Sequence, residues 1–110
     1  MRVLLTGATG FVGRGLLERM SALANLELVA ALRRPVSGFP ESVTSLQVPG
    51  LEPDTDWRTA LEGIDAVIHS AARVHVMHDQ SSDPLAEFRK VNVEGTLNLA
   101  RQAAAAGVRR

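Results

Sequence analysis

The sequence predicts an α/β fold in which about four parallel strands form a partial doubly wound sheet, ordered 3-2-1-4, with helices on both faces. Two observations support this prediction. Short apolar runs with the length of buried strands alternate along the chain with longer stretches whose apolar residues recur at helical spacing. The first apolar run also leads through a glycine-rich turn, residues 6–13 (TGATGFVG), directly into a helical pattern, as such sheets usually begin.

The glycine-rich turn joins a strand expected at about residues 2–6 to a helix expected at about residues 11–24. Gly7 would allow the tight turn, Gly10 would let a pyrophosphate approach the backbone, and Gly13 would let the helix lie close to the strand. Free N–H groups and a partial positive charge at the helix start would bind the phosphates. The predicted dinucleotide contacts are Gly7, Thr9, Gly10, Phe11, Val12 and Gly13. The alternative is that the glycines serve only a tight strand–helix turn.

The second strand, expected at residues 26–32, decides the choice of coenzyme. Units that prefer NAD place an acidic residue at the end of this strand, where it binds the adenosine ribose. This sequence has Arg33 and Arg34 there. Two guanidinium groups can bind a 2′-phosphate and stack on adenine, so the pair favours NADP over NAD. The alternative is that both arginines are ordinary surface residues.

Two further strands are expected at residues 43–48 and 66–68, joined by a short helix that starts near Trp57 and ends at Gly63. We interpret Asp54 and Asp56 as start signals of that helix and not as an acid pair. Small side chains follow the fourth strand: Ser70, Ala71 and Ala72. Ligands of such sheets bind at the carboxyl ends of the strands, so we expect this segment to face the glycine-rich turn.

The last helix is expected to begin with Asp83 as its cap and Pro84 in its first turn, and to end before Gly107. Gly95 lies inside this helix, where glycine costs about 1 kcal/mol relative to alanine. We expect a close approach to the neighbouring strand to offset that cost. This long, partly apolar helix is also a candidate surface for a partner.

Three histidines raise the question of a metal site. His75 and His78 are three residues apart, a spacing that suits two ligands on one helical face, but no third ligand completes a known motif. We therefore predict no metal. We expect His69, which follows the fourth strand, to be a packed and hydrogen-bonded residue and not a catalyst.

The composition bears on possible partners and location. Twelve basic residues balance twelve acidic ones, so no net field favours nucleic acid or an anionic membrane. No apolar stretch approaches the ~20 residues that span a bilayer. The chain has no cysteine and so can form neither a disulfide nor a thiolate metal site. We expect a single small cytoplasmic domain with no nucleic-acid or membrane partner.

Four segments together resemble the extended branch of the short-chain dehydrogenase/reductase superfamily, which includes NAD(P)-dependent nucleotide-sugar epimerases, dehydratases and 4-keto reductases. They are residues 6–13, 63–72 (GIDAVIHSAA), 91–96 (VNVEGT) and 105–108 (AAGV), in the family's order and spanning nearly the whole chain. The resemblance implies that residues 1–110 are the N-terminal portion of a Rossmann-type NAD(P)-binding domain. The remaining strands and a C-terminal substrate domain would then be absent from this chain.

The resemblance also implies roles for individual residues. Ser70, Ala71 and Ala72 would run past the pyrophosphate and the nicotinamide ribose. Gly50 and Leu51 stand where the family usually has an acidic residue for the adenine amino group, so adenine would contact backbone atoms there or lose the contact. Asn92 matches an asparagine that shapes the active site, or makes a structural hydrogen bond. The wall of a sugar-nucleotide pocket would include Arg73, Val74 and His75.

The implied reaction is hydride transfer at C4 of a UDP- or dTDP-sugar, in surface-polysaccharide biosynthesis, by a full-length homodimer. The family transfers the proton with a Tyr-x-x-x-Lys pair, whereas this chain has no tyrosine and its only lysine is Lys90. We therefore expect the 110-residue chain alone to bind coenzyme weakly and to catalyse nothing. Two alternatives remain: a non-catalytic NADP-binding regulator or redox sensor, and a reductase of a steroid, flavonoid or other non-sugar ketone.

Overall fold

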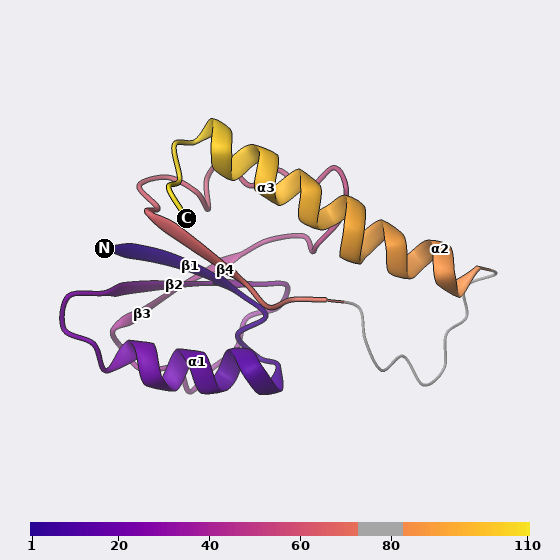
Figure 1. Cartoon of the computed structure of the whole chain (residues 1–110). Coiled ribbons are helices and arrows are strands. Elements are labelled where there is room, and N and C mark those ends of the chain that lie inside the picture. The colour runs from indigo at the N-terminus through magenta and orange to yellow at the C-terminus, as the bar shows by residue number, and fades with distance from the viewer. Residues whose placement is uncertain (73–82) are drawn as a thin grey trace.

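The computed structural model describes residues 1–72 and 83–110, which form a parallel sheet in the order β3-β2-β1-β4 (Figure 1). The strands are β1 (Arg2–Thr6), β2 (Glu27–Leu32), β3 (Val43–Gln47) and β4 (Ala66–His69). Thr6 at the end of β1 pairs with Ala31 on one side and His69 on the other. The carboxyl ends of the strands therefore lie along one edge, and the predicted strand order is confirmed.

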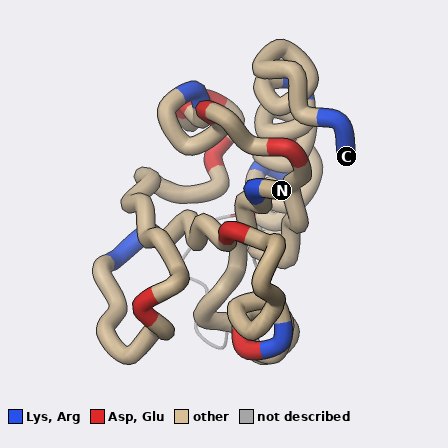
Figure 2. Tube along the Cα trace, turned by 90° about the vertical axis from the view of Figure 1, so that its left-hand side faces the viewer, with Lys and Arg blue, Asp and Glu red and all other residues tan. Residues whose placement is uncertain are grey.

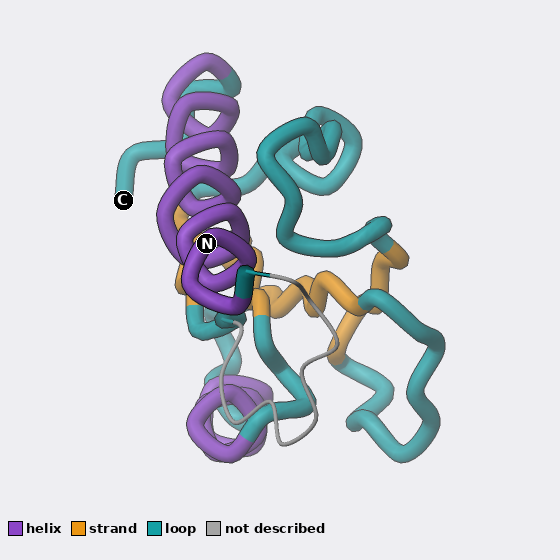
Figure 3. Tube along the Cα trace, turned by 90° about the vertical axis from the view of Figure 1, so that its right-hand side faces the viewer, coloured by secondary structure: helices purple, strands orange, loops and turns teal. Residues whose placement is uncertain are grey.

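Helices cover both faces of the sheet, as predicted. Helix α1 (Phe11–Ser21) lies on one face and ends three residues earlier than expected. The other face carries a continuous helical rod made of α2 (Pro84–Arg89), η1 (Lys90–Gly95) and α3 (Thr96–Ala105). Figure 3 looks onto the carboxyl edge of the sheet and shows the rod nearly end-on, with α1 on the opposite side of the strands.

Two hydrophobic clusters, one on each side of the sheet, form the core. Leu4 and Val29 contribute to the cluster beneath α3, whereas Val3, Leu5 and Leu28 contribute to the cluster beneath α1. Successive side chains of a strand point to opposite faces. Because β1 and β2 are covered on both faces, nearly every position in them must be apolar, which explains the continuous apolar runs.

The segment between β3 and β4 differs from the prediction, because residues 57–63 form turns and not a helix. Leu61 N donates to Trp57 O at 2.9 Å, but the hydrogen bonds that follow span only three residues. Tertiary contacts hold the segment instead. The Trp57 side chain is buried beneath α3, and its backbone N–H donates to Gln102 Oε1 at 2.7 Å.

The predicted start of the last helix is confirmed, since Asp83 Oδ1 accepts a hydrogen bond from Ala86 N at 3.1 Å and Pro84 occupies the first turn. The wide π turn η1 in the middle of the rod was not predicted. Gly95 is buried, and a Cβ added to it would lie 2.7 Å from the Leu51 carbonyl oxygen. Its close neighbour is therefore the segment after β3, and not a strand as expected.

Candidate functional site

Two of the three turn glycines are required by contacts inside the chain. Gly7 has φ +74°, and a Cβ there would lie 2.6 Å from both Ala71 N and Ser70 Oγ. A Cβ on Gly13 would overlap the Gly7 carbonyl oxygen. These two glycines let the first turn of α1, the end of β1 and the segment after β4 meet in direct contact.

Gly10 has no such internal explanation. It is exposed, its φ of −78° suits any residue, and a Cβ there would meet only the Gly7 carbonyl oxygen, at 3.4 Å. The missing side chain therefore leaves space on the outer surface of the turn. A turn without a ligand accounts for Gly7 and Gly13, but not for Gly10.

The N-terminus of α1 lies open beside this space. Gly10 is the N-cap residue and has no side chain to accept a hydrogen bond from the first N–H groups of the helix. Next to it, Phe11 is 98% exposed and Val12 and Thr9 are also exposed. Free amide donors beside an exposed aromatic ring suit a ligand that combines phosphate with a flat organic group.

The segment after β4 is fastened to the end of β1. Ser70 Oγ donates to the Thr6 carbonyl at 2.6 Å, and the backbone N–H groups of Ser70 and Ala71 each donate to Thr6 Oγ1 at 3.2 Å. Ala72 follows and is exposed. The structure thus brings Gly7, Gly13, Ser70 and Ala71 together, as the sequence predicts. The predicted pocket residues Arg73, Val74 and His75, together with His78, lie outside the described residues.

His69 lies beneath this junction and bridges two threonines. Its Nδ1 is 2.6 Å from Thr6 Oγ1, and its Nε2 is 3.1 Å from Thr96 Oγ1 on α3. Burial lowers the pKa of the His69 imidazole. The prediction of a packed, hydrogen-bonded histidine is confirmed. Its two partners were not predicted, although a threonine that ends an apolar strand is itself a sign of a buried hydroxyl.

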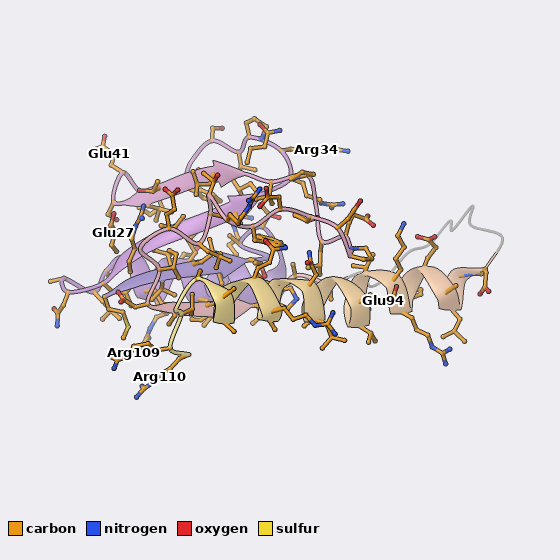
Figure 4. All side chains as sticks on the ribbon, turned by 90° about the horizontal axis from the view of Figure 1, so that it is seen from above. Glu27, Arg34, Glu41, Glu94, Arg109 and Arg110 are labelled. Carbon is orange, nitrogen blue, oxygen red and sulfur yellow. The ribbon has the colours of Figure 1, made fainter. Side chains whose placement is uncertain are left out.

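A second junction lies at the ends of β2 and β3. Gly50 is buried with φ +144°, and a Cβ there would lie 3.5 Å from Cδ of Arg33. The aliphatic part of the Arg33 side chain therefore packs beside Gly50. Arg34 is exposed and projects outward from the loop after β2 (Figure 4). The structure brings Arg33 and Gly50 together at the edge where the adenosine was expected.

Side-chain amides of α3 hold the segment that contains Gly50. Asn98 Nδ2 and Gln102 Nε2 donate to the Thr55 carbonyl at 2.9 and 2.7 Å, and Thr55 Oγ1 donates to the Gly50 carbonyl at 2.7 Å. These residues were not predicted, although two amides four residues apart on a helix signal a common partner. Since the Gly50 carbonyl is engaged and Leu51 packs on Gly95, fewer backbone acceptors remain for adenine.

The π turn η1 contains the remaining predicted residue, Asn92, which is half-buried. In the same turn, Lys90 Nζ lies 3.3 Å from Glu52 Oε2. The hydrogen bond to Glu52 is the main reason why the pKa of Lys90 is raised. The lysine ties η1 to the segment after β3.

Other kinds of site find no support in the described parts of the chain. Residues 1–72 and 83–110 contain no group of three side chains that could hold a metal ion. Within the same ranges, every helix is too short or too polar to cross a bilayer. In the view of Figure 2, acidic and basic residues are interspersed along the trace.

Comparison with known proteins gives consistent matches over the whole chain. Residues 3–110 match the NAD dependent epimerase/dehydratase family. The chain is 38% identical over 108 residues to a UDP-glucose 4-epimerase of Vibrio cholerae, covering 98% of this chain and 32% of that protein. It is 36% identical over 117 residues to a 3-beta-hydroxysteroid dehydrogenase of Mycolicibacterium neoaurum, covering 99% and 30%.

Solved structures agree in fold. MoeE5 in complex with UDP-glucose and NAD superimposes with a TM-score of 0.77 and 30% identity, over 98% of this chain and 34% of that chain. The chain spans about a third of the length of the curated relatives described above.

Proposed function

This chain belongs to the NAD dependent epimerase/dehydratase family, and from that premise we propose that it binds a nicotinamide dinucleotide along the carboxyl edge of its sheet. The observation that carries the proposal is Gly10. This position has room for a Cβ and an ordinary backbone conformation, yet it lacks a side chain where the open N-terminus of α1 begins. A pyrophosphate placed there would use the space and the free amides together.

The arrangement of the strand ends supports an orientation for the coenzyme. The pyrophosphate would lie on Gly10 and the first turn of α1, in the centre of the edge. The adenosine would lie toward Arg33 and Gly50, and the nicotinamide ribose toward Ser70 and Ala71. The nicotinamide, when bound, supplies a hydride acceptor or donor. The chain's own residues bind and orient it.

For the coenzyme itself, we propose NADP with NAD as the competing candidate. Arg33 and Arg34 directly follow β2, where an acidic residue would favour NAD. Arg33 packs beside Gly50 and so lies at the proposed adenosine position, whereas Arg34 projects into solvent. NAD is favoured by MoeE5, which was solved with NAD bound.

For the whole protein, we propose an epimerase, dehydratase or reductase that transfers a hydride at C4 of a nucleotide sugar, with a role in surface-polysaccharide biosynthesis. The similarity to a UDP-glucose 4-epimerase and to a structure containing UDP-glucose supports the substrate class. The proton-transferring tyrosine would come from residues outside these 110, since the chain contains none. The chain alone would therefore bind coenzyme without turnover.

A second candidate is the oxidation of a hydroxysteroid or another non-sugar alcohol. The 36% identity to a 3-beta-hydroxysteroid dehydrogenase favours it. The two reactions share the coenzyme edge and differ in the substrate pocket. Assays of the full-length protein with UDP-glucose and with a 3β-hydroxysteroid would separate them. Release of reduced coenzyme with the steroid alone would overturn the nucleotide-sugar proposal.

We also propose that the full-length protein forms a homodimer through the rod. Its outer surface exposes Leu85, Val93 and Leu97, which are spaced by multiples of four residues. Arg89 lies between two of them and can form ion pairs at the rim. A second copy packed on this stripe would remove its apolar side chains from water.

The coenzyme proposal is tested by titrating NADPH and NADH into the 110-residue chain and following the reduced nicotinamide fluorescence. Gly10→Val should abolish binding because the added side chain would occupy the pyrophosphate position, and thermal unfolding checks that the variant is folded. Gly15→Ala is the matched control. A Cβ at Gly15 meets nothing within 4 Å, so binding should be unchanged. Equal binding by wild type and Gly10→Val would overturn the proposal.

A further inference from the structure

Three residues from three elements form a row of hydrogen bonds beneath the sheet edge on which the coenzyme is proposed to lie. Thr6 ends β1 and is 3% exposed, His69 ends β4, and Thr96 begins α3. The imidazole lies between the two hydroxyls, at 2.6 Å from Thr6 and 3.1 Å from Thr96. These hydrogen bonds connect the ends of β1 and β4 to the long helical rod.

The hydrogen bonds of Thr6 indicate which nitrogen of the His69 imidazole carries the proton. A hydroxyl accepts at two lone pairs and donates one hydrogen. Both lone pairs of Thr6 Oγ1 face N–H donors, since Ser70 N and Ala71 N each lie 3.2 Å from it, although the Ser70 N–H is shared with the Thr6 carbonyl oxygen at 3.3 Å. The Thr6 hydrogen must therefore point to Nδ1 of His69, which accepts it. The neutral ring then carries its own proton on Nε2 and donates to Thr96 Oγ1.

We propose that His69 is a positioning residue of the coenzyme site. By accepting from Thr6, it fixes the hydroxyl rotor that receives the Ser70 and Ala71 amides, and so holds that backbone against Gly7. The proposal rests on the proposed function, because it concerns the edge on which the coenzyme would lie. The proposal goes beyond the proposed function because it assigns a role to a side chain that lies beneath the site.

The tight contact at Gly7 makes this role effective. The Ala71 nitrogen lies 2.6 Å from where a Cβ of Gly7 would be, so the two backbone segments are in contact without a gap. If the Thr6 hydroxyl turned away from its two donors, the Ala71 N–H would lose its acceptor, and only the hydrogen bonds of Ser70 to the Thr6 carbonyl would hold the segment. The floor of the nicotinamide end would then shift relative to the pyrophosphate-binding turn.

Burial lowers the pKa of the His69 imidazole, and no charged side chain of the described residues contributes to that shift. Arg2 lies at the opposite end of β1 with its backbone N–H on Asp65, and Lys90 of η1 pairs with Glu52. Glu94, also in η1, is exposed. The hydrogen bonds to the two threonines and the burial of the ring therefore define its protonation.

The first test reads the tautomer directly, whether or not coenzyme binds. Nitrogen-15 NMR of the 110-residue chain at neutral pH, with the His69 signals identified by their loss in His69→Gln, distinguishes the forms. We expect a protonated Nε2 and an unprotonated Nδ1. A ring protonated on Nδ1, or on both nitrogens, would overturn the proposal.

The second test uses conservative pairs of variants in the NADPH titration. Thr96→Val removes the acceptor of Nε2 at a partly exposed position and should weaken binding about tenfold, as expected for one hydrogen bond. Thr96→Ser keeps the hydroxyl and should bind like wild type. Thr6→Val and Thr6→Ser form the same pair at the other end, provided that thermal unfolding shows Thr6→Val to be folded.

Equal affinities within the Thr96 pair would overturn the proposal while leaving coenzyme binding intact. Failure of the wild type to bind either coenzyme would instead overturn the proposed function. In that case the tautomer measurement still decides whether the assigned proton position is correct.

Discussion

Gly13 packs so closely on Gly7 that a Cβ added to Gly13 would overlap the Gly7 carbonyl oxygen. This contact fixes the start of α1 at the end of β1. Gly13→Ala should therefore lower the free energy of unfolding by about 1–3 kcal/mol, as overpacking does. Urea denaturation measures the change.

Gly15→Ala is the control for that experiment, because Gly15 is exposed in the same helix and has open space around its Cα. It should raise the free energy of unfolding by about 0.5–1 kcal/mol through helix propensity alone. If both variants were equally stable, the close packing of Gly13 on Gly7 would be contradicted.

Gly95→Ala should also destabilise the chain, although alanine is the better helix former. A Cβ at Gly95 would lie 2.7 Å from the Leu51 carbonyl oxygen, which is backbone and cannot easily move aside. The overlap should cost more than the gain of about 1 kcal/mol from propensity. The measurement is the midpoint of thermal unfolding, with the exposed Ala100→Gly as a pure propensity control. A higher midpoint for Gly95→Ala would exclude the contact.

Arg33→Asp should reverse the coenzyme preference if Arg33 binds a 2′-phosphate. The carboxylate would repel that phosphate and could accept hydrogen bonds from an unmodified ribose, so NADPH affinity should fall and NADH affinity should rise. A change of the affinity ratio of at least tenfold, about 1.4 kcal/mol, is expected. Arg19→Asp, at the far end of α1, controls for overall charge. Equal changes in the affinities for NADPH and NADH would show that Arg33 does not bind the 2′-phosphate.

Val93→Glu should convert the full-length protein from dimer to monomer, because it puts a charge into the apolar stripe of the rod. Sedimentation velocity measures the mass in solution. Leu23→Glu changes an exposed apolar residue on the other side of the sheet and should leave the dimer intact. A monomeric wild type, or a dimeric Val93→Glu variant, would be evidence against this interface.

The parts of the fold that sequence predicts are those that depend on local periodicity. Each strand can be recognised from its own residues. In the same way, Asp83 and Pro84 define a helix start within four residues. The π turn and the irregular segment near Trp57 depend instead on distant partners. Gly95 must meet Leu51, and Trp57 must meet Gln102, 45 positions away. No local pattern contains that information.

The same distinction applies to the candidate site. The glycine turn and the Ser70–Ala71 segment each follow a strand, and the carboxyl ends of parallel strands share one edge, so their proximity could be predicted. The bridge from Thr6 through His69 to Thr96 joins residues 63 and 27 positions apart. Each of these residue types is common, and only the register of β1 with β4 and the position of α3 bring them together.

The final prediction concerns pH and follows from the state of His69. Burial lowers the pKa of this imidazole in the folded chain, whereas an unfolded histidine titrates near 6.5. The unfolded state therefore binds the proton more readily. The contribution of neutral His69 to the free energy of unfolding is complete above about pH 6.5 and is lost as the pH falls through the pKa of the folded chain. Urea denaturation at about pH 7.5 and pH 5.5 should show a larger loss of stability in wild type than in His69→Gln. His75 and His78 are present in both proteins, so their common contribution cancels in the comparison. Equal losses in the two proteins would mean that His69 accepts a proton without disturbing the fold, contrary to its bridging position.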